Sequence, residues 1–431
     1  MSERKRIYLC LAHMSEAGLE QKYIKEAFDT NWVVPLGPNV NAFEEDLKNY
    51  VGEGREVVAL SAGTAAVHLA LLACGVGYGD EVIVQSFTFC ASSHPITYLG
   101  ATPVFVDSEK ESWNMDPDLL EVAIKDRIAK TGKKPKAIIP VALYGMPYNV
   151  DRIMEIAGKY EIPVVEDSAE GFGSRWKGQF LGTFGEYGIL SFNGNKMITT
   201  SGGGALICRE EENKNRLSWM ASQAREDYPY YHHNVIGYNY RMSNVCAGIG
   251  RGQMTVVEEH IAHHRHVQQL YETLFSDVDG ITVHKQPDTK WKNADGKECS
   301  IYESNYWLCC IEISPELKVV GQEEAYKEVV LFAVSGTDNT KPGADRPTTD
   351  FQPNDNVEAL RLFLAQAGIE TRPLWKPMHK QPVYDGFPSY VNGVSESLFK
   401  QGLCLPSGPC VSDNDVKLIV ETIKSAIIKR S

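Results

Sequence analysis

Long apolar runs, paired cysteines and excess positive charge are all missing from this sequence of 431 residues. No stretch approaches the roughly 20 apolar residues that cross a bilayer, and the N-terminal segment lacks a signal-peptide core. The 10 cysteines show no paired metal-ligand spacing, which indicates reduced thiols. The net charge of −13 argues against a nucleic-acid binder. We therefore expect a cytoplasmic protein that binds neither membranes nor nucleic acid.

Short β-branched strands alternate with helices from residue 56 onward. Strands are predicted at 56–60, 81–85, 102–107, 137–143, 163–167, 187–192 and 205–208. Helices are predicted between them at 65–74, 116–130 and 150–160, after two earlier helices at 20–29 and 40–51. This alternation predicts an α/β fold with a mostly parallel sheet covered by helices. Functional side chains should gather beyond the carboxyl ends of such strands.

The alternation weakens after residue 252, so we predict a large domain over 1–252 and a second unit over 253–431. The second unit should begin with one long helix at 253–275 and continue as a smaller α+β domain. Its remaining elements are predicted at 281–285, 305–313, 357–367 and 413–429, the last of them capped by Ser412. The segment 334–356 is polar and rich in Pro and Gly, and we expect a surface excursion there.

One lysine, Lys196, lies between two predicted strands in the segment EYGILSFNGNKMITTSGGGALI, residues 186–207. A lysine held in a desolvated pocket at the end of a strand can form a Schiff base with a carbonyl compound. A solvated loop lysine is the commoner case, so the assignment depends on what the rest of the chain supplies.

Three residues could hold a phosphate group. Gly63 and Thr64 follow a strand and open a helix, where free backbone N–H groups and the helix dipole favour anions. Ser191 precedes the loop of Lys196 and could add a second hydroxyl. An ordinary helix cap would explain the first two as well, and a strand serine bonded to backbone would explain the third.

Three further residues could hold an aromatic ring. Phe89 could stack on a planar ring, or belong to the core. Asp167 ends a predicted strand and could keep a pyridine nitrogen protonated, or cap a helix. Glu170 follows about one turn later and could reach a ring hydroxyl. The common location of these groups at strand ends favours a phosphorylated aromatic cofactor.

The motifs that carry these residues are SAGTAAVHLALLACGVGYGDEVIVQSFTF, GATPVFVD, VEDSAEGFGS and SFNGNKMITTSGGGALI. They resemble the DegT/DnrJ/StrS-type nucleotide-sugar aminotransferases, which are pyridoxal phosphate (PLP) enzymes of fold type I. The resemblance extends from about residue 22 to the C-terminal helix, except for segment 334–356. It implies a PLP-binding domain, a smaller C-terminal domain, L-glutamate as amino donor and a nucleotide sugar as acceptor.

Other segments resemble the transaminases of bacillosamine biosynthesis, which aminate UDP-4-keto-6-deoxy-N-acetylglucosamine at C4. These segments are NGN at 193–195, GYNYRMSN at 237–244, ETRPLWKPMH at 370–379 and CLPSG at 404–408. The alternatives are a dTDP- or GDP-linked substrate, amination at C3, a sugar dehydratase of the same fold, and a non-catalytic regulator. The dehydratases lack the Schiff-base lysine, so Lys196 argues against them.

The resemblance also implies a role for each candidate residue. Lys196 would carry PLP as a Schiff base, and Asp167 would pair with its pyridine nitrogen. The other residues implied to contact the cofactor are Gly63, Thr64, Phe89, Glu170 and Ser191, in the positions described above. Asn239 would reach the cofactor phosphate of the neighbouring subunit, which implies a homodimer with shared active sites.

The substrate residues are less constrained by the sequence. Arg372 and His379 lie in a local basic cluster that could bind a diphosphate or be a solvated loop, and the resemblance favours the substrate. Arg225 could bind a carboxylate or a phosphate. Asn193 stands where many relatives carry a proline-containing or aromatic segment before the lysine, so it bears on sugar specificity.

A histidine cluster lies in EEHIAHHRH, residues 258–266. His260 and His264 have the i, i+4 spacing of helical metal ligands. No third ligand accompanies them, so we do not expect a metal site.

Overall fold

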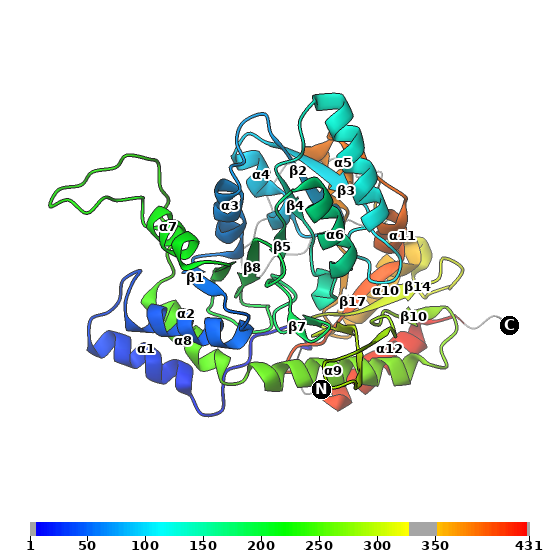
Figure 1. Ribbon diagram of the computed structural model, residues 1–431. Helices are drawn as coiled ribbons and strands as arrows, with labels where there is room; N and C mark the ends of the chain where they lie inside the picture. The colour runs from blue at the N-terminus through cyan, green and yellow to red at the C-terminus, as the bar shows by residue number, and fades with distance from the viewer. Residues whose placement is uncertain (1–5, 327–350, 429–431) are drawn as a thin grey trace, which may run out of the picture.

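A computed structural model describes residues 6–326 and 351–428 (Figure 1). Its central sheet consists of two four-stranded ladders. One ladder runs β1 (Glu56–Leu60), β9 (Gly204–Cys208), β8 (Tyr187–Ser191), β5 (Val165–Asp167). The other runs β16 (Ser389–Tyr390), β3 (Thr102–Val106), β2 (Glu81–Gln85), β4 (Ala137–Ile139). Parallel bridges from Ile138 to Val164 and from Val141 to Asp167 connect the two ladders.

Most neighbouring strands of this sheet are parallel, as predicted. The exception is β9, which runs antiparallel to both β1 and β8. The chain returns beside β8 through the loop 192–203, which contains no helix of the kind that usually forms the crossover to a parallel strand. The same loop carries Lys196 and leaves it at the carboxyl end of β8.

Helices cover both faces of the sheet (Figure 1). Alternate residues of β2 face opposite sides: Val82 and Val84 pack in the cluster that contains α3 (Gly63–Ala73), α4 (His94–Tyr98) and α7 (Glu211–Ala221). Ile83, between them, packs with α5 (Pro117–Thr131) and α6 (Val150–Tyr160). Burial on both faces explains why these strands are continuous apolar runs.

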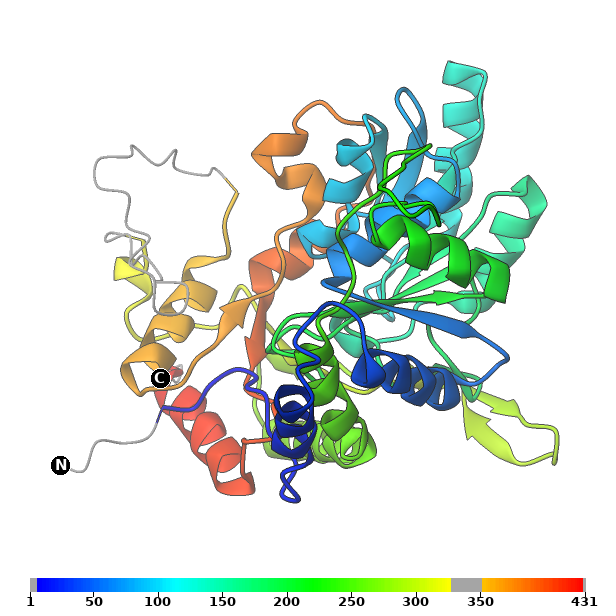
Figure 2. The same ribbon diagram turned by 90° about the vertical axis from the view of Figure 1, so that its left-hand side faces the viewer.

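The long helix predicted at 253–275 is present, but it begins at Val257 and not at residue 253. The structure has α8 (Asn244–Met254) and α9 (Val257–Phe275), with a break at Thr255 and Val256. The backbone of Val256 is not helical, and the Thr255 hydroxyl donates to the carbonyl of Gly252 at 2.6 Å. A hydroxyl that bonds to a nearby carbonyl competes with helix continuation. Helix α8 packs against α1 (Leu19–Asp29) and α2 (Pro38–Val51) beside the sheet (Figures 1 and 2).

A second, antiparallel sheet lies in the C-terminal part. Its order is β10 (Ile281–Val283), β14 (Cys309–Ile313), β17 (Gly402–Leu405), β15 (Arg372–Pro373). It shares a core with α9, α10 (Asp355–Gln366) and α12 (Asp413–Ala426). The predicted cap of α12 is confirmed, because Ser412 and Asp415 form a capping box. The domain division at residue 252 stays a prediction.

The remaining elements are small. They are β6 (Arg175–Trp176), β7 (Gln179–Phe180), β11 (Lys290–Lys292), β12 (Glu298–Ser300), β13 (Tyr302–Glu303) and α11 (Val394–Gln401), with short 3-10 turns at Cys90–Ser92, Leu143–Gly145, Gln322–Glu324, Met378–Lys380 and Pro382–Tyr384. Most of the predicted excursion at 334–356 lies outside the described residues. Among the helices that are described, none has both the length and the apolar composition to span a membrane.

Candidate active site

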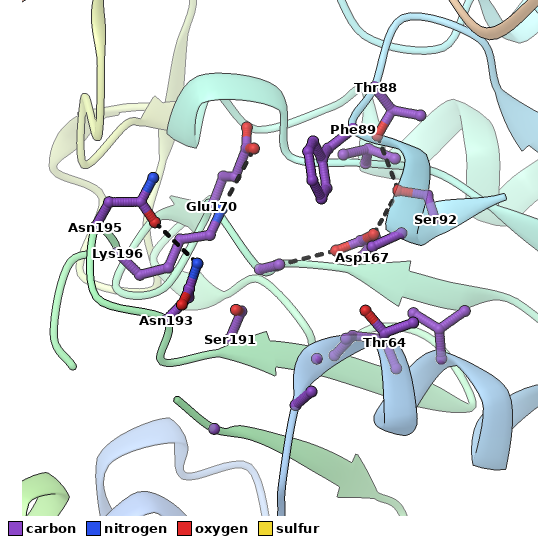
Figure 3. A pocket seen from close by; sticks show the side chains of 18 of the residues that line it. Thr64, Thr88, Phe89, Ser92, Asp167, Glu170, Ser191, Asn193, Asn195 and Lys196 are labelled. Carbon is purple, nitrogen blue, oxygen red and sulfur yellow. Dashed lines mark hydrogen bonds and ion pairs between the residues drawn. The ribbon is translucent and has the colours of Figure 1, made fainter. Parts of the chain in front are cut away.

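A cavity of about 290 Å³ lies where β1, β5 and β8 end (Figure 3). The chain continues from these three strands into α3, into the loop of Glu170 and into the loop of Lys196. Two tryptophans from the second half of the sequence, Trp307 and Trp375, complete the wall. The predicted residues that line this cavity are Gly63, Thr64, Phe89, Asp167, Glu170, Ser191, Asn193 and Lys196.

Lys196 points its amine into this cavity rather than into solvent. Its side chain is 13% exposed, and its Nζ lies 3.4 Å from Oε1 of Glu170. The amine also lies 3.9 Å from the centre of the Trp307 ring, within cation–π distance. The Trp307 indole N–H donates to the carbonyl of Asn195 at 2.6 Å, which fixes this ring beside the lysine loop. Lys196 is therefore not a solvated loop lysine.

Asp167 is a buried carboxylate with its hydrogen bonds arranged in advance. It is 5% exposed at the end of β5. Ser92 Oγ donates to its Oδ2 at 2.6 Å and the Ala169 N–H donates to its Oδ1 at 3.1 Å. Ser92 and Thr88 in turn share a hydrogen bond of 2.8 Å (Figure 3). Burial raises the pKa of Asp167, and the Ser92 and Ala169 bonds oppose that rise. A cationic N–H facing this carboxylate would keep it ionised.

Glu170 links the lysine to a strained backbone position. Its Oε2 accepts the N–H of Tyr144 at 2.7 Å, while its Oε1 faces Lys196. Tyr144 has a φ of 54°, an uncommon value for a residue other than glycine, and this conformation coincides with the N–H bond to Glu170. Burial raises the pKa of Glu170, and the charge of Lys196 lowers it.

The start of α3 offers unused hydrogen-bond groups to an anion. Its N-cap residue, Ala62, makes no side-chain cap bond. In the described part of the chain, the hydroxyls of Thr64 and Ser191 have no hydrogen-bond partner, although both residues line the cavity. Gly63 keeps the approach open, because a Cβ there would lie 3.1 Å from the Cβ of Ser191. Among the described residues, α3 therefore has no side-chain N-cap bond, and the Ser191 hydroxyl is not bonded to the backbone.

Phe89 is not a core residue. It is 54% exposed, lines the cavity, and its ring centre lies 6.1 Å from that of Trp375. An aromatic side chain left this open beside a cavity is available to stack on a ligand.

Four predicted residues do not line the cavity, and their roles stay predictions. Arg225 stacks on the ring of Tyr231 at 4.5 Å, and Asn239 forms a backbone bridge with Ser222. Arg372 forms an ion pair with Glu370 at 2.8 Å. His379 lies between Ser86 Oγ at 2.6 Å and Glu396 Oε1 at 3.1 Å. The expected basic cluster is thus partly neutralised by carboxylates.

The histidines of α9 face the protein interior. His260 Nδ1 lies 3.2 Å from the carbonyl of Met197, and His264 Nδ1 lies 3.1 Å from that of Tyr306. Burial lowers the pKa of His264 to about 3. Across residues 6–326 and 351–428, no group of three or more His, Cys, Asp or Glu side chains could hold a metal ion.

Ser92, Trp307 and Trp375 are among the wall residues that were not predicted from the sequence. Ser92 follows Phe89 by three positions, and nothing in the spacing indicates that it bonds to Asp167, 75 residues away. Trp307 lies two residues before β14 of the second sheet, far from the other wall residues in the sequence. Trp375 lies inside the segment ETRPLWKPMH, which was noted for its family resemblance and its charges, but not for this tryptophan.

Comparison with known proteins shows the family to which this sequence belongs. The sequence matches the DegT/DnrJ/EryC1/StrS aminotransferase family over residues 15–307 and 346–424. It is 40% identical over 423 residues to EpsN of Bacillus subtilis (strain 168), which is described as a pyridoxal phosphate-dependent aminotransferase; 97% of this chain and 95% of EpsN are covered. It is 33% identical over 418 residues to a GDP-perosamine synthase of Escherichia coli O157:H7, covering 96% and 98% of the two chains.

A solved structure gives the same assignment. The crystal structure of a DegT DnrJ EryC1 StrS aminotransferase from Brucella abortus is 26% identical, with a TM-score of 0.78 and 95% of each chain covered. The match includes both the central sheet and the smaller C-terminal part. This chain therefore belongs to the DegT/DnrJ/EryC1/StrS aminotransferase family, a family of PLP-dependent enzymes.

Proposed function

We propose that this aminotransferase moves an amino group from L-glutamate to C4 of a nucleotide-linked 4-keto-6-deoxy sugar. UDP-4-keto-6-deoxy-N-acetylglucosamine is the first candidate, on the sequence resemblance described above. The observation that supports the chemistry best is one cavity that holds the Lys196 amine, the buried Asp167 carboxylate and the hydroxyls of Thr64 and Ser191, which have no hydrogen-bond partner among the described residues.

The donor set of this cavity fits PLP. The uncapped start of α3, with Thr64 and Ser191, suits a phosphate group. Asp167 suits a protonated pyridine nitrogen, and Phe89 is free to pack on the ring. Lys196 would bind the aldehyde carbon covalently. When bound, PLP supplies an electron sink for the negative charge that develops at the amino-bearing carbon.

The side chains of this protein then have distinct tasks. Lys196 Nζ, as a neutral amine, would be the base that moves a proton to and from the amino-bearing carbon. Glu170 Oε1, 3.4 Å away, would accept a hydrogen bond from this amine and hold it beside the reacting carbon. Asp167, held by Ser92 and Ala169, would keep a ring nitrogen protonated. The two tryptophans limit access of water to the lysine.

A GDP-linked sugar is the second candidate. A specific observation favours it, because the relative named GDP-perosamine synthase covers nearly the whole chain at 33% identity. For either nucleotide we propose a homodimer in which Asn239 reaches the cofactor phosphate of the partner subunit. Asn239 is consistent with this role, since it lies outside the cavity of its own chain.

The test is a direct amination assay. The PLP-loaded protein is incubated with L-glutamate and, separately, with UDP-, dTDP- and GDP-linked 4-keto-6-deoxy sugars, with Lys196→Ala as the control. We expect 2-oxoglutarate and a C4-amino sugar, identified by mass and NMR, from the UDP-linked substrate. Amination of the GDP-linked sugar alone would select the second candidate. No product from any of the sugars, or a C3-amino product, would contradict the proposal.

A further inference from the structure

His379 is the centre of a buried hydrogen-bonded relay that lies outside the cavity. Its Nδ1 lies 2.6 Å from Oγ of Ser86, and its Nε2 lies 3.1 Å from Oε1 of Glu396. Because a carboxylate can only accept, a neutral imidazole here carries its proton on Nε2, and its Nδ1 accepts from the Ser86 hydroxyl. Lys380 Nζ lies 3.2 Å from the same oxygen of Glu396, so the carboxylate is held from two sides.

The order serine, histidine, glutamate is also that of a hydrolase triad. Ser86, however, is 0% exposed, and the His379 side chain is 6% exposed. None of the three relay residues, Ser86, His379 and Glu396, lines the cavity of Lys196. A substrate carbonyl cannot reach a hydroxyl that is closed to solvent. The relay therefore holds the chain in place and does not supply a nucleophile.

The relay fastens one turn of the C-terminal part to the end of β2. Met378 N–H donates to the carbonyl of Ser86 at 2.8 Å, and His379 N–H donates to its Oγ at 3.3 Å, in addition to the bond at Nδ1. Ser86 directly follows β2, and its own N–H donates to the carbonyl of Val106 in β3 at 2.8 Å. The turn is thus anchored on the central sheet itself.

Each of the two fastened segments carries an aromatic residue of the cavity wall. Phe89 comes three residues after Ser86, and Trp375 comes three residues before Met378. Both rings line the cavity, and their centres lie 6.1 Å apart. The two segments are therefore joined twice, once by the contact of the rings and once by the relay. With so few residues between them, a shift of Ser86 moves the ring of Phe89.

The segment that begins at Ser86 also reaches the carboxylate of Asp167. Thr88 N–H donates to the carbonyl of Ser86 at 3.0 Å, and the Thr88 hydroxyl shares a bond with Ser92. Ser92 in turn donates to Asp167 (Figure 3). The position of Ser86 consequently affects both the ring that could stack on PLP and the hydrogen bond that prepares Asp167.

We propose that Ser86, His379 and Glu396 are positioning residues for PLP, which fix the segment that presents Phe89 to the cofactor without touching a substrate. A side chain that contacts a cofactor needs such support from the groups around it. Both ring nitrogens of His379 are already bonded, so this role differs from the diphosphate contact that the resemblance implied for it. The inference depends on the PLP site and not on the choice of nucleotide sugar.

Two substitutions of His379 separate the two ends of the relay. The amide of an asparagine lies where Nδ1 lies and can accept from Ser86, whereas the amide of a glutamine lies where Nε2 lies and can donate to Glu396. His379→Asn thus keeps the bond to Ser86, while His379→Gln and Ser86→Ala both lose it. His266→Gln is the matched control, because His266 makes a comparable 2.9 Å contact with Asp413 on the exposed side of α9.

Three readouts are compared, and two of them need no sugar. They are PLP affinity, from titration of the cofactor-free protein, the visible circular dichroism of bound PLP, which reports the orientation of its ring, and KM for the keto-sugar at saturating PLP. We expect His379→Gln and Ser86→Ala to weaken PLP binding by up to about tenfold, because one buried hydrogen bond is the most that can be passed on to the cofactor.

The pattern across the variants is the sharper test. His379→Gln and Ser86→Ala should also change the dichroism band, and their combination should lose no more than either alone, since both remove the same bond. His379→Asn should keep most of the PLP affinity, and His266→Gln should match the wild type. KM should be the least affected of the three readouts.

Other patterns would overturn the relay. PLP affinity and dichroism that stay unchanged in both His379→Gln and Ser86→Ala would do so, as would equal losses in His379→Asn and His379→Gln. A loss confined to KM would make His379 a substrate ligand instead. A wild-type protein that aminates no nucleotide keto-sugar would contradict the proposed function, but it would leave the PLP and dichroism measurements as a valid test of the relay.

Discussion

The hydrogen bond from Ser92 to Asp167 gives a quantitative test of how the cofactor is held. Ser92→Ala removes the Oγ–H that donates to the buried Oδ2 of Asp167 at 2.6 Å. A hydrogen bond to a charged group contributes about 1.5–3 kcal/mol. Its loss also leaves the Asp167 carboxylate less stable, since the Ser92 bond is one of the factors that lower its pKa. The carboxylate must be ionised to pair with a protonated ring nitrogen, so the loss falls on the cofactor-bound state.

The expected result is weaker PLP binding by about tenfold to a hundredfold, which is the same free energy written as a ratio. Absorbance or fluorescence titration of the cofactor-free protein with PLP measures it. Thr88→Val is the matched control: it removes the 2.8 Å bond between Thr88 and Ser92 and leaves the Ser92–Asp167 bond intact. Thr88→Val should weaken PLP binding clearly less than Ser92→Ala does.

Two results would refute this reasoning. One is a Ser92→Ala protein that binds PLP as tightly as the wild type. The other is an equal loss in Thr88→Val, which would show that the whole polar network, and not the bond to Asp167, determines affinity.

Three further predictions concern other parts of the chain. His264 has a pKa of about 3 in the folded protein against an ordinary value of 6.5, so the unfolded chain binds the proton first and the free energy of unfolding falls as the pH drops below 6.5. Urea titrations should show a loss of about 1.4 kcal/mol from this group at pH 5.5. This loss should be absent in His264→Gln. Gly63→Ala should weaken the binding of PLP and of pyridoxamine phosphate alike, because the new Cβ would crowd Ser191 at 3.1 Å; unchanged affinity for both would contradict the phosphate site. Mixed Lys196→Ala and Asn239→Ala subunits should regain about one quarter of the wild-type activity, as one complete site per mixed dimer requires, whereas no regain would show that Asn239 does not serve the partner's site.

Local pattern was enough to predict most strands of the central sheet and the eight lining residues named above. Strands β1, β2, β3 and β4 are mostly apolar, and the side chains after β5 and β8 could be assigned to one edge because parallel strands end together. Lys196, Asp167 and Ser191 all lie where that rule placed them. The start of the long helix was predicted four residues too early, because residues 253 and 254 belong to α8 and the helix breaks at Thr255 and Val256 before α9 begins.

The residues that the sequence did not reveal are those brought in from a distance. Trp307 and Trp375 reach the cavity through contacts between the C-terminal part and the central sheet, and no periodicity encodes such contacts. Ser92 was missed for a similar reason, since a serine after an aromatic residue has many uses. The charges of Arg372 and His379 were predicted to face a substrate, and their pairing with Glu370 and Glu396 depends on three-dimensional neighbours.

Borohydride reduction of the PLP-loaded protein, followed by peptide mass spectrometry, tests the central claim most directly. Reduction fixes the cofactor to whichever amine holds it. We expect a yellow protein, a single modified peptide and the modification on Lys196, with none in Lys196→Ala. A colourless protein, or a cofactor fixed to another lysine, would contradict it.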